Sequence, residues 1–334
     1  MREKITLKAL SELLGLSPAT ISKSLSNSSE ISSETKERVK KVAAFYNYVP
    51  NHYTPKPKIK KRKTIGVIIP TMQISFFSQA LESMINEANK NDFRIVACIS
   101  DESVKKEREN IDFLIQRQVD GVVISPAYET QVSANITHLN KLKQLKLPMV
   151  LFGRTIDNIT CDKIDIDDFG ETYKATQELF MSGRKRILYI SGSTETGSNE
   201  QRKNGYISAV LNLNGKSSCL EYRNTKVFLE DFKLSLKSNE IDGILISDEL
   251  TAIQLIKNLQ KWKYNLPKDI SITGFSTGLI EENYFPSFIA IDQKPAEQGV
   301  LAIKTLINRI ENEIDCDVAS CKLQTSLLHE ESTV

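Results

Sequence analysis

The sequence has little of what a secreted, membrane-bound or metal-dependent protein needs. Its 334 residues include only five cysteines and three histidines, and neither set has the spacing of a metal site or of a disulfide framework. Free or buried thiols in a reducing cytoplasm are therefore expected. No apolar run approaches the roughly 20 residues that span a bilayer, and the N-terminus is polar and charged, unlike a signal peptide. These absences predict a soluble, cytoplasmic protein with no membrane partner.

Catalytic signatures are also missing. The chain contains no Gly-x-Ser-x-Gly, His-Glu-x-x-His or Gly-x-Gly-x-x-Gly motif. The stretch Gly192–Asn199 has the glycine spacing of a phosphate-binding loop but lacks the Lys and Ser/Thr that complete it. Carboxylates such as Asp167 and Asp168 belong to no motif with a nucleophile or a metal. The sequence predicts no enzyme, no catalytic residue, no metal and no cofactor.

Charge is distributed unevenly along the chain. The totals of 44 Lys and Arg and 42 Asp and Glu nearly balance. Residues 1–63, however, hold 14 basic and 5 acidic side chains, whereas the remaining residues hold 30 and 37. A basic head attracts the phosphate backbone of nucleic acid. A solvated arm without a partner is the alternative, and a DNA-binding motif in the same head weakens it.

Residues 6–27, TLKALSELLGLSPATISKSLSN, predict two short helices joined by a tight turn. Thr6 can cap the first helix, and Gly15 can end it because glycine adopts a positive φ easily. Ser17 can cap the second helix, with Pro18 at its first position. This pattern is typical of a helix-turn-helix, although an ordinary amphipathic hairpin is the alternative. The apolar face of the first helix is predicted to contain Leu7, Leu10, Leu13 and Leu14.

The same residues resemble the start of LacI-type (lac repressor-like) transcription regulators. The run Leu16–Lys23 matches the family's Val/Leu-Ser-x-x-Thr-Val/Ile-Ser-Arg/Lys pattern, and Asn27, Tyr48 and Asn51 follow at the same spacing. The resemblance implies a regulator, usually a repressor, that binds pseudo-palindromic operator DNA as a homodimer and is nucleoid-associated when bound. The DNA-binding residues that it implies are Thr6, Ser17, Pro18, Ala19, Thr20, Ser22, Lys23, Asn27, Tyr48 and Asn51.

Three residues of the second helix bear on base recognition. Pro18 and Ala19 occupy the two positions that usually set base preference in the family, and neither side chain forms hydrogen bonds. They can offer only apolar contact, for instance to a thymine methyl group. Lys23 replaces the commoner Arg and cannot form the forked pair of bonds to guanine. Site selection is therefore expected to depend on Lys23, on DNA shape and on dimer spacing.

The segment Thr54–Lys63, TPKPKIKKRK, predicts a linker because six of its residues are basic and two are proline. In the family the linker forms a hinge helix on DNA, with a Leu that wedges into the minor groove. Here Pro57 stands at the Leu position, and a proline inside a helix costs about 3 kcal/mol. The basic run can grip phosphates instead, or Ile59 can replace the wedge. The candidate hinge residues are Pro55, Pro57, Lys58, Ile59, Lys60, Lys61 and Arg62.

Beyond residue 63, short apolar runs alternate with helical stretches. Repeated βα units predict parallel sheets with helices on both faces, and about 270 residues are long for one sheet. We expect an α/β body with two doubly wound lobes, and the family resemblance implies a body like that of periplasmic sugar-binding proteins. The predicted strands are Ile65–Ile69, Arg94–Ile99, Gly121–Ser125, Met149–Phe152, Arg186–Ile190, Asp242–Ile246, Ser271–Gly274 and Phe288–Ile291. The predicted helices include Phe77–Lys90, Lys105–Gln116, Gln201–Leu213 and Leu250–Trp262.

The resemblance divides the chain into four parts. Residues 1–51 form the all-α helix-turn-helix head, and residues 52–63 form the linker. Residues 64–161 and 294–322 form the first lobe, and residues 162–291 and 323–334 form the second. A ligand cleft between the lobes is expected beyond the carboxyl ends of the strands. The expected crossovers between lobes lie near Cys161–Asp162, Ile291–Lys294 and Lys322–Leu323.

Matching positions imply an effector site in that cleft. The implied residues are Phe76, Phe77, Arg154, Arg202, Ser247, Ser276 and Gln293. Family members that bind sugars often carry Asp at the positions of Gly153 and Ser276, so two hydroxyl-binding carboxylates are missing here. Without them, Arg202 would be unneutralised and would favour an anionic ligand such as a sugar phosphate or a sugar acid. Packing in the core is the alternative for one of the two phenylalanines.

Two readings of the whole chain follow. The first is a transcription regulator whose operator affinity is controlled by a small ligand, a sugar or a sugar phosphate. The second is a two-lobed solute-binding protein for transport, which would need an export signal and no basic head. A body that answers a protein partner instead of a small ligand also stays open.

Overall fold

The computed structural model describes residues 6–46, 48, 63–192, 197–222, 225–238, 240–278, 280, 288–312, 320–325 and 327–328. They belong to two units, Met1–Lys61 and Arg62–Val334, called here the head and the body. None of the described helices is both long and apolar enough to cross a membrane. The predicted DNA contact Asn51 and all the candidate hinge residues lie outside the described residues, namely Pro55, Pro57, Lys58, Ile59, Lys60, Lys61 and Arg62.

Three helices form the head: α1 (Leu7–Leu14), α2 (Pro18–Leu25) and α3 (Ser33–Phe45). The hydroxyl of Thr6 accepts a hydrogen bond from the Ala9 amide, and that of Ser17 accepts one from the Thr20 amide, at 3.2 and 3.1 Å. Gly15 has φ 62°, the left-handed conformation that ends α1. These caps confirm the predicted helix-turn-helix.

A small core holds the three helices together. Its buried members are Leu10, Leu14, Ile21, Val39 and Ala43, and Leu7 packs partly buried against them. The prediction was wrong for Leu13, whose side chain is 55% exposed. A helix of eight residues buries only a narrow stripe, and Leu13 lies beside that stripe.

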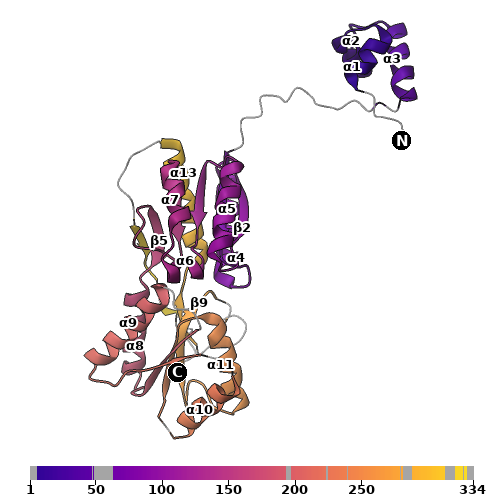
Figure 1. The fold of residues 1–334 in the computed structure, drawn as a ribbon. Helices are drawn as coiled ribbons and strands as arrows, with labels where there is room; N and C mark the ends of the chain where they lie inside the picture. Colours follow the sequence, from indigo (N-terminus) through magenta and orange to yellow (C-terminus); the bar gives the residue numbers. More distant parts are fainter. Residues whose placement is uncertain are drawn as a thin grey trace. The chain divides into compact units, whose positions relative to one another are not determined.

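Two parallel sheets build the body, one in each lobe (Figure 1). The first sheet has the strand order β11-β5-β4-β3-β1-β2, and the second has the order β12-β10-β9-β8-β6-β7. Only β12 runs antiparallel to its neighbour. The first sheet comprises β1 (Lys63–Ile69), β2 (Phe93–Ile99), β3 (Gly121–Ile124), β4 (Met149–Phe152), β5 (Asp162–Ile166) and β11 (Ser320–Leu323). The second comprises β6 (Ile187–Ser191), β7 (Ser218–Glu221), β8 (Gly243–Ile246), β9 (Ser271–Ser276), β10 (Ile289–Asp292) and β12 (Leu327–Leu328).

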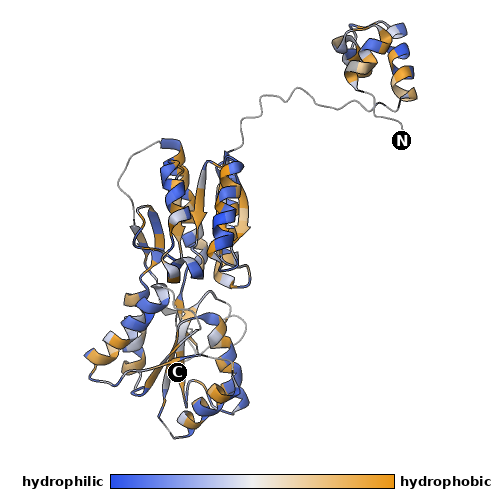
Figure 2. Cartoon of the chain, in the orientation of Figure 1, coloured by the Kyte–Doolittle hydropathy of each residue, from blue (hydrophilic) through white to orange (hydrophobic). Residues whose placement is uncertain are grey.

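Helices cover both sheets, as expected for parallel strands. In Figure 2 the strands are mostly hydrophobic, while the helices carry hydrophilic residues on their outer sides. The first lobe includes α4 (Ser75–Lys90), α5 (Val104–Gln116), α6 (Tyr128–Ser133), α7 (Thr137–Gln144) and the late helix α13 (Pro295–Asn312). The second includes α8 (Asp168–Met181), α9 (Gly197–Asn212), α10 (Lys226–Lys237) and α11 (Glu249–Lys261).

The first crossover lies later than expected. Strand β5, Asp162–Ile166, pairs with β4 and β11 in the first sheet, so residues 162–166 belong to the first lobe and not to the second. The chain enters the second lobe only at α8. Its alternation of half-buried and buried residues identifies β5 as a strand, but its charged residues concealed it at the level of sequence. Strands β7, β11 and β12 were also not predicted, and all three lie at sheet edges.

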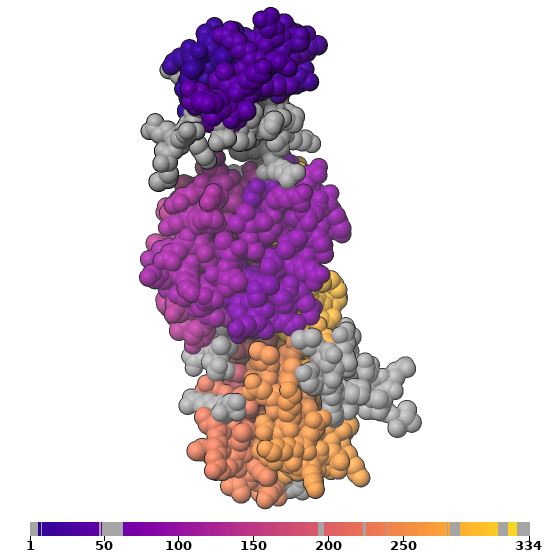
Figure 3. Space-filling view, turned by 90° about the vertical axis from the view of Figure 1, so that its right-hand side faces the viewer, coloured from indigo at the N-terminus to yellow at the C-terminus, as the bar shows by residue number. Residues whose placement is uncertain are grey.

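The chain passes between the lobes twice more. It leaves β10 at Asp292 and enters α13 at Pro295, and it runs from β11 to β12 between Leu323 and Leu327. Figure 3 shows the elements of the first lobe in purple and magenta and those of the second in salmon and orange. The yellow of α13 appears beside the purple residues because this late helix packs on α4. These passages connect the two lobes, which lie one above the other in Figure 1.

Helices α8 and α9 pack closely because Gly205 has no side chain. A Cβ atom at Gly205 would lie 2.3 Å from the backbone oxygen of Phe169, a contact too short to exist without movement of α8. We predict that Gly205→Ala lowers the free energy of unfolding of the body by about 1–2 kcal/mol, because overpacking outweighs the gain in helix propensity. Urea unfolding followed by the fluorescence of Trp262, the single tryptophan, measures the change.

Gly197→Ala is the matched control, because a Cβ there meets no atom within 4 Å. We expect this variant to equal the unchanged protein or to exceed it in stability. Equal stability of the Gly205→Ala protein would contradict the close-packing explanation.

Candidate functional site

The exposed face of α2 is the first candidate site. Pro18, Ala19, Ser22 and Lys23 are all exposed on it, so each is accessible to a binding partner. Thr20 is half-buried, and its hydroxyl lies 2.8 Å from that of Ser17. Ser17 and Thr20 therefore hold the start of the helix in place, which fixes where the exposed side chains stand.

The remaining predicted contacts of the head have structural partners. Asn27 follows α2 with φ 62°, a conformation that asparagine tolerates better than most residues, and its side-chain oxygen accepts a bond of 3.2 Å from Lys40. Tyr48 is half-buried against the head core. Lys23 is paired with the carboxylate of Glu30. The sequence analysis did not single out Glu30 or Lys40.

Residues 6–46 of the head carry only a small positive charge. Residues 6–46 contain six Lys and Arg and four Asp and Glu. Most of the surplus found in residues 1–63 lies instead in residues 54–63, with six basic and no acidic side chains. The three helices thus carry little net charge, and most of the positive charge of the first 63 residues lies in the predicted linker.

The predicted effector residues form clusters inside each lobe. In the first lobe Phe76 and Phe77 are only 7% and 3% exposed, and their rings meet edge to face with centroids 5.3 Å apart. Phe152 stacks against Phe76 at 6.3 Å. Both phenylalanines pack in the core of that lobe, and the small Gly153 leaves room for the Phe76 ring, which a Cβ would approach to 2.6 Å.

Arg202 is the centre of the cluster in the second lobe. Its Nε donates to Asp168 Oδ1 at 2.6 Å, and Nη1 donates to the Ser247 carbonyl at 2.5 Å. Nη2 donates to Gln293 at 3.5 Å, and the guanidinium lies 3.5 Å from the centre of the Phe275 ring. The expectation of an unneutralised Arg202 is therefore wrong, because Asp168 supplies its counter-charge. Burial nevertheless raises the pKa of Asp168, while the charge of Arg202 opposes that rise.

Arg154 and Ser276 are also engaged. Arg154 donates to both carboxylate oxygens of Glu102 at 2.7 and 3.0 Å and lies over the Phe77 ring. Ser276 is buried and donates to Glu249 Oε1 at 2.8 Å. Each lobe thus neutralises its own arginine, so neither guanidinium is a free site for an anion.

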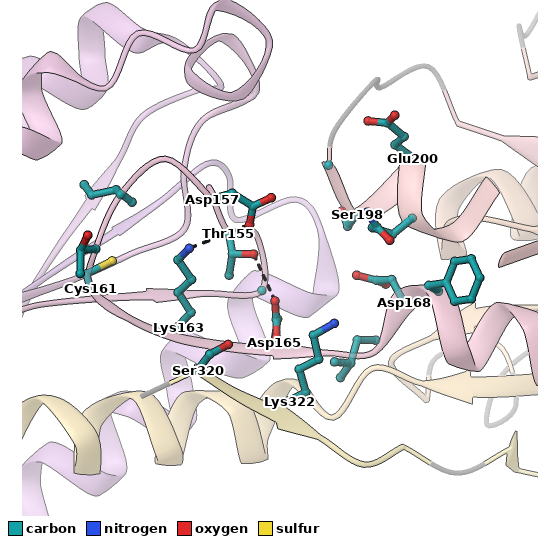
Figure 4. A pocket seen from close by; sticks show the side chains of 17 residues that line it. Thr155, Asp157, Cys161, Lys163, Asp165, Asp168, Ser198, Glu200, Ser320 and Lys322 are labelled. Carbon is teal, nitrogen blue, oxygen red and sulfur yellow. Dashed lines mark hydrogen bonds and ion pairs between the residues drawn. The ribbon is translucent and has the colours of Figure 1, made fainter. Parts of the chain in front are cut away.

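A cavity of about 600 Å³ lies between the lobes, beside the crossover strands (Figure 4). One wall comes from the loop after β4 and from β5, the opposite wall from the starts of α8 and α9, and β11 adds the third side. None of the seven predicted effector residues lines it, although Gly153 and Asp168 connect it to their clusters. Its other lining residues include Thr155, Thr160, Ile166, Phe169, Ser198 and Gln201.

Carboxylates outnumber ammonium groups in the cavity wall. The acidic lining residues are Asp157, Asp165, Asp168 and Glu200, and the basic ones are Lys163 and Lys322. Lys163 lies 4.0 Å from Asp157, and Lys322 lies 3.6 Å from Asp167, so each ammonium group already has a carboxylate neighbour. This lining favours ligands that donate hydrogen bonds over ligands that carry negative charge.

Asp165 is the least satisfied group of the lining. Its Oδ2 accepts a bond of 3.1 Å from the hydroxyl of Thr155 (Figure 4). Its Oδ1 is buried and has no hydrogen-bond partner within the part of the chain that the structure describes. Burial raises the pKa of Asp165 above its usual 3.8, against the lowering effect of the Thr155 hydrogen bond and of Lys322.

Sequence reasoning missed Asp165 because β5 was not predicted. The run Asp162–Asp168, DKIDIDD, alternates polar and apolar residues with the period of a strand. That alternation places Lys163 and Asp165 on one face of a strand, and it was the sequence signal from which β5 and its polar face could have been predicted.

Three family profiles match this chain. The profile described as periplasmic binding proteins and sugar binding domain of LacI family matches residues 62–231. The one described as periplasmic binding protein-like domain matches residues 176–332, and the one described as bacterial regulatory proteins, lacI family, matches residues 6–51.

Individual relatives match over nearly the whole length. The chain is 26% identical over 313 residues to the sucrose operon repressor of Lactococcus lactis subsp. lactis, covering 92% of this chain and 94% of that protein. It is 24% identical over 314 residues to the ribose operon repressor of Haemophilus influenzae, covering 92% of each.

Solved structures share the fold. A complex of the transcriptional regulator CelR with cellobiose has a TM-score of 0.69 at 21% identity, covering 98% of this chain and 100% of that one. The lac repressor dimer bound to operator and the anti-inducer ONPF has a TM-score of 0.69 at 18% identity, covering 99% and 100%.

The buried carboxylate of the cavity predicts a pH-dependent stability. Because the pKa of Asp165 is raised in the folded protein, its ionisation costs stability as the pH rises through that pKa. We predict that Asp165→Asn melts at a higher temperature than the unchanged protein at pH 7.5, and that the difference shrinks as the pH falls toward 4. Circular dichroism melts at pH 7.5 and at pH 4.5 test this.

Asp112→Asn is the control, because it removes a half-buried carboxylate of α5 that pairs with Lys141 at 2.6 Å and lies outside the cavity. We expect no gain in its melting temperature at pH 7.5. The variant and the unchanged protein differ in melting temperature at each pH. If Asp165→Asn gains less over the unchanged protein at pH 7.5 than at pH 4.5, the raised pKa of Asp165 is refuted.

Proposed function

The chain belongs to the LacI family of bacterial regulatory proteins, and we propose that it represses transcription from a pseudo-palindromic operator under the control of a neutral, hydroxyl-rich ligand bound between its lobes. One observation carries the proposal. A capped helix-turn-helix with a polar exposed second helix stands on the same chain as a two-lobed body with an inter-lobe cavity. Such a chain can couple ligand binding to DNA affinity.

DNA recognition is assigned to the head. A helix-turn-helix places its second helix in the major groove, and α2 exposes Pro18, Ala19, Ser22 and Lys23 for that purpose. One head reads one half-site, so a homodimer on a two-fold symmetric site is proposed. Because α2 carries a single charged side chain, much of the affinity is expected from the basic residues 54–63.

The ligand chemistry follows from the cavity wall. Carboxylates accept hydrogen bonds from hydroxyl groups, and Asp165 has an oxygen that lacks a donor in the described structure. Phe169 adds an aromatic surface, and Thr155, Thr160 and Ser198 add hydroxyls. A phosphorylated sugar would meet four acidic and two basic side chains in the wall, and both ammonium groups already have a carboxylate neighbour. A neutral sugar therefore fits this site better than a sugar phosphate.

Ligand binding at this place can change the relation of the lobes. The cavity wall includes residues from both lobes and from β5 and β11, so a ligand that contacts both walls stabilises one spacing between them. A ligand shifts such an equilibrium only by its difference in affinity for the two states. The proposal places the regulator in the cytoplasm, on the chromosome when DNA-bound, and assigns it no catalytic step.

A role as a solute-binding protein for transport is not favoured. The match of residues 6–51 to bacterial regulatory proteins gives the chain a DNA-binding head that such a role does not use.

Selection of genomic fragments by the purified chain tests the DNA half of the proposal. We expect a shared pseudo-palindrome that remains bound at physiological salt, at least about 1,000-fold more tightly than unrelated DNA. Binding that disappears between 50 and 200 mM salt and shows no sequence preference would contradict specific recognition.

A calorimetric panel tests the ligand half. The relatives suggest sucrose, ribose and cellobiose as probes, with glucose 6-phosphate as the anionic comparison. We expect binding of a neutral sugar, weakened at least about tenfold in Asp165→Asn because a ligand hydroxyl loses its charged acceptor, and unchanged in Asp112→Asn. Tighter binding of glucose 6-phosphate than of every neutral probe would overturn the neutral-ligand assignment.

A further inference from the structure

The only charged residue of α2 is held by a neighbouring carboxylate. Lys23 lies in the last turn of the helix, and its Nζ donates to Glu30 Oε2, seven residues later in the turn before α3. The Lys23 and Glu30 side chains are 50% and 65% exposed, so the pair lies at the surface. The hydrogen bond and the charge of Lys23 lower the pKa of Glu30, whose carboxylate, like that of any exposed glutamate, is ionised at neutral pH.

The second cation of this corner is also engaged. Lys40 of α3 donates to the side-chain oxygen of Asn27, which stands between Lys23 and Glu30 in the sequence. Asn27 is neutral, so Lys40 keeps its full charge, whereas Lys23 is neutralised by Glu30. The difference singles out Lys23 as the cation whose attraction for phosphate is masked.

Two effects oppose a DNA phosphate that approaches Lys23. The phosphate must replace the Glu30 carboxylate as the partner of the ammonium group. It is also repelled by the displaced carboxylate, which stays within a few ångströms. Charges this close interact even at physiological salt, where screening extends over roughly 8 Å. The exchange is accessible, because an exposed ion pair is weak, typically worth less than a factor of about five in an equilibrium constant.

We propose that Glu30 is an electrostatic restraint on Lys23 that lowers the affinity of the head for DNA phosphates, so that α2 contributes little to sequence-independent binding. The inference rests on the DNA-binding function proposed above. In this proposal the basic residues 54–63 provide the attraction to a duplex of any sequence. Helix α2 adds affinity only at DNA sites where its contacts in the groove are favourable enough to displace Glu30 from Lys23. Glu30 is thereby a specificity-determining residue, although it is acidic and lies outside α2.

The test removes the charge of Glu30 in the full-length chain. We expect Glu30→Gln to bind a scrambled duplex about three- to fivefold more tightly at 100 mM salt, measured by fluorescence anisotropy. The slope of log affinity against log salt should become steeper by up to about one, since one more phosphate is neutralised. Affinity for the selected operator should rise less, so the ratio of specific to non-specific binding should fall.

A double variant shows whether Glu30 acts through Lys23. In a Lys23→Gln background the ammonium group is gone, so Glu30→Gln should change binding to the scrambled duplex by less than about half of its effect in the unchanged background, on a logarithmic scale. An equal gain in both backgrounds would mean that Glu30 repels DNA by itself and would overturn the restraint.

Glu37→Gln is the matched control for loss of one acidic charge. Glu37 is an exposed carboxylate of α3 paired with Lys41 at 3.7 Å, so the same charge is removed from another surface pair of the head. We expect a smaller gain than for Glu30→Gln. Equal gains in these two variants, or no gain in Glu30→Gln, would overturn the inference.

Loss of operator affinity in Glu30→Gln would also overturn it, because Glu30 would then position Lys23 for a base contact. These outcomes differ from a failure of the proposed function, in which the unchanged chain would select no operator at all.

Discussion

Three passages of the chain between two parallel sheets constrain the whole body. Because all six strands of the first sheet and five of the second run parallel, each lobe presents the carboxyl ends of its strands at one edge. The passages after β5, β10 and β11 bring these two edges together. Polar loops and helix starts gather there, since no strand continues to bury them. The inter-lobe cavity and both arginine clusters are consequences of this arrangement.

Charge balance at that edge determines which ligands the body can accept. Arg202 and Arg154 each have a carboxylate partner in their own lobe, Asp168 and Glu102. A buried charge without a partner is strongly unfavourable, so these pairs form before any ligand arrives. The cavity wall then holds more carboxylates than ammonium groups, and Asp165 Oδ1 has no hydrogen-bond partner among the described residues. The head shows the same pairing of opposite charges, since Glu30 neutralises the one cation of α2.

Local sequence patterns were sufficient for the head and for the general architecture. Caps and turns depend on neighbours within four residues, so Thr6, Gly15 and Ser17 could be assigned before the structure was known. The apolar runs of the central strands were equally clear, because strands buried on both faces read as continuous hydrophobic segments. The strands that escaped prediction lie toward sheet edges, where polar residues interrupt the pattern. The failure to predict strand β5 had the largest consequence, because β5 carries Lys163 and Asp165, which both line the cavity.

By itself, the sequence determined the helix-turn-helix of the head, the basic segment after it, the two-lobed α/β class and the resemblance to LacI-type regulators. Only the tertiary structure decided which charges meet. Arg202 and Asp168 are 34 residues apart, and Arg154 and Glu102 are 52 apart. Motif positions could name the arginines but not their partners, and an unneutralised Arg202 was therefore expected wrongly. The physical reason is that pairing depends on the distance between side chains after folding, which spacing along the chain does not encode.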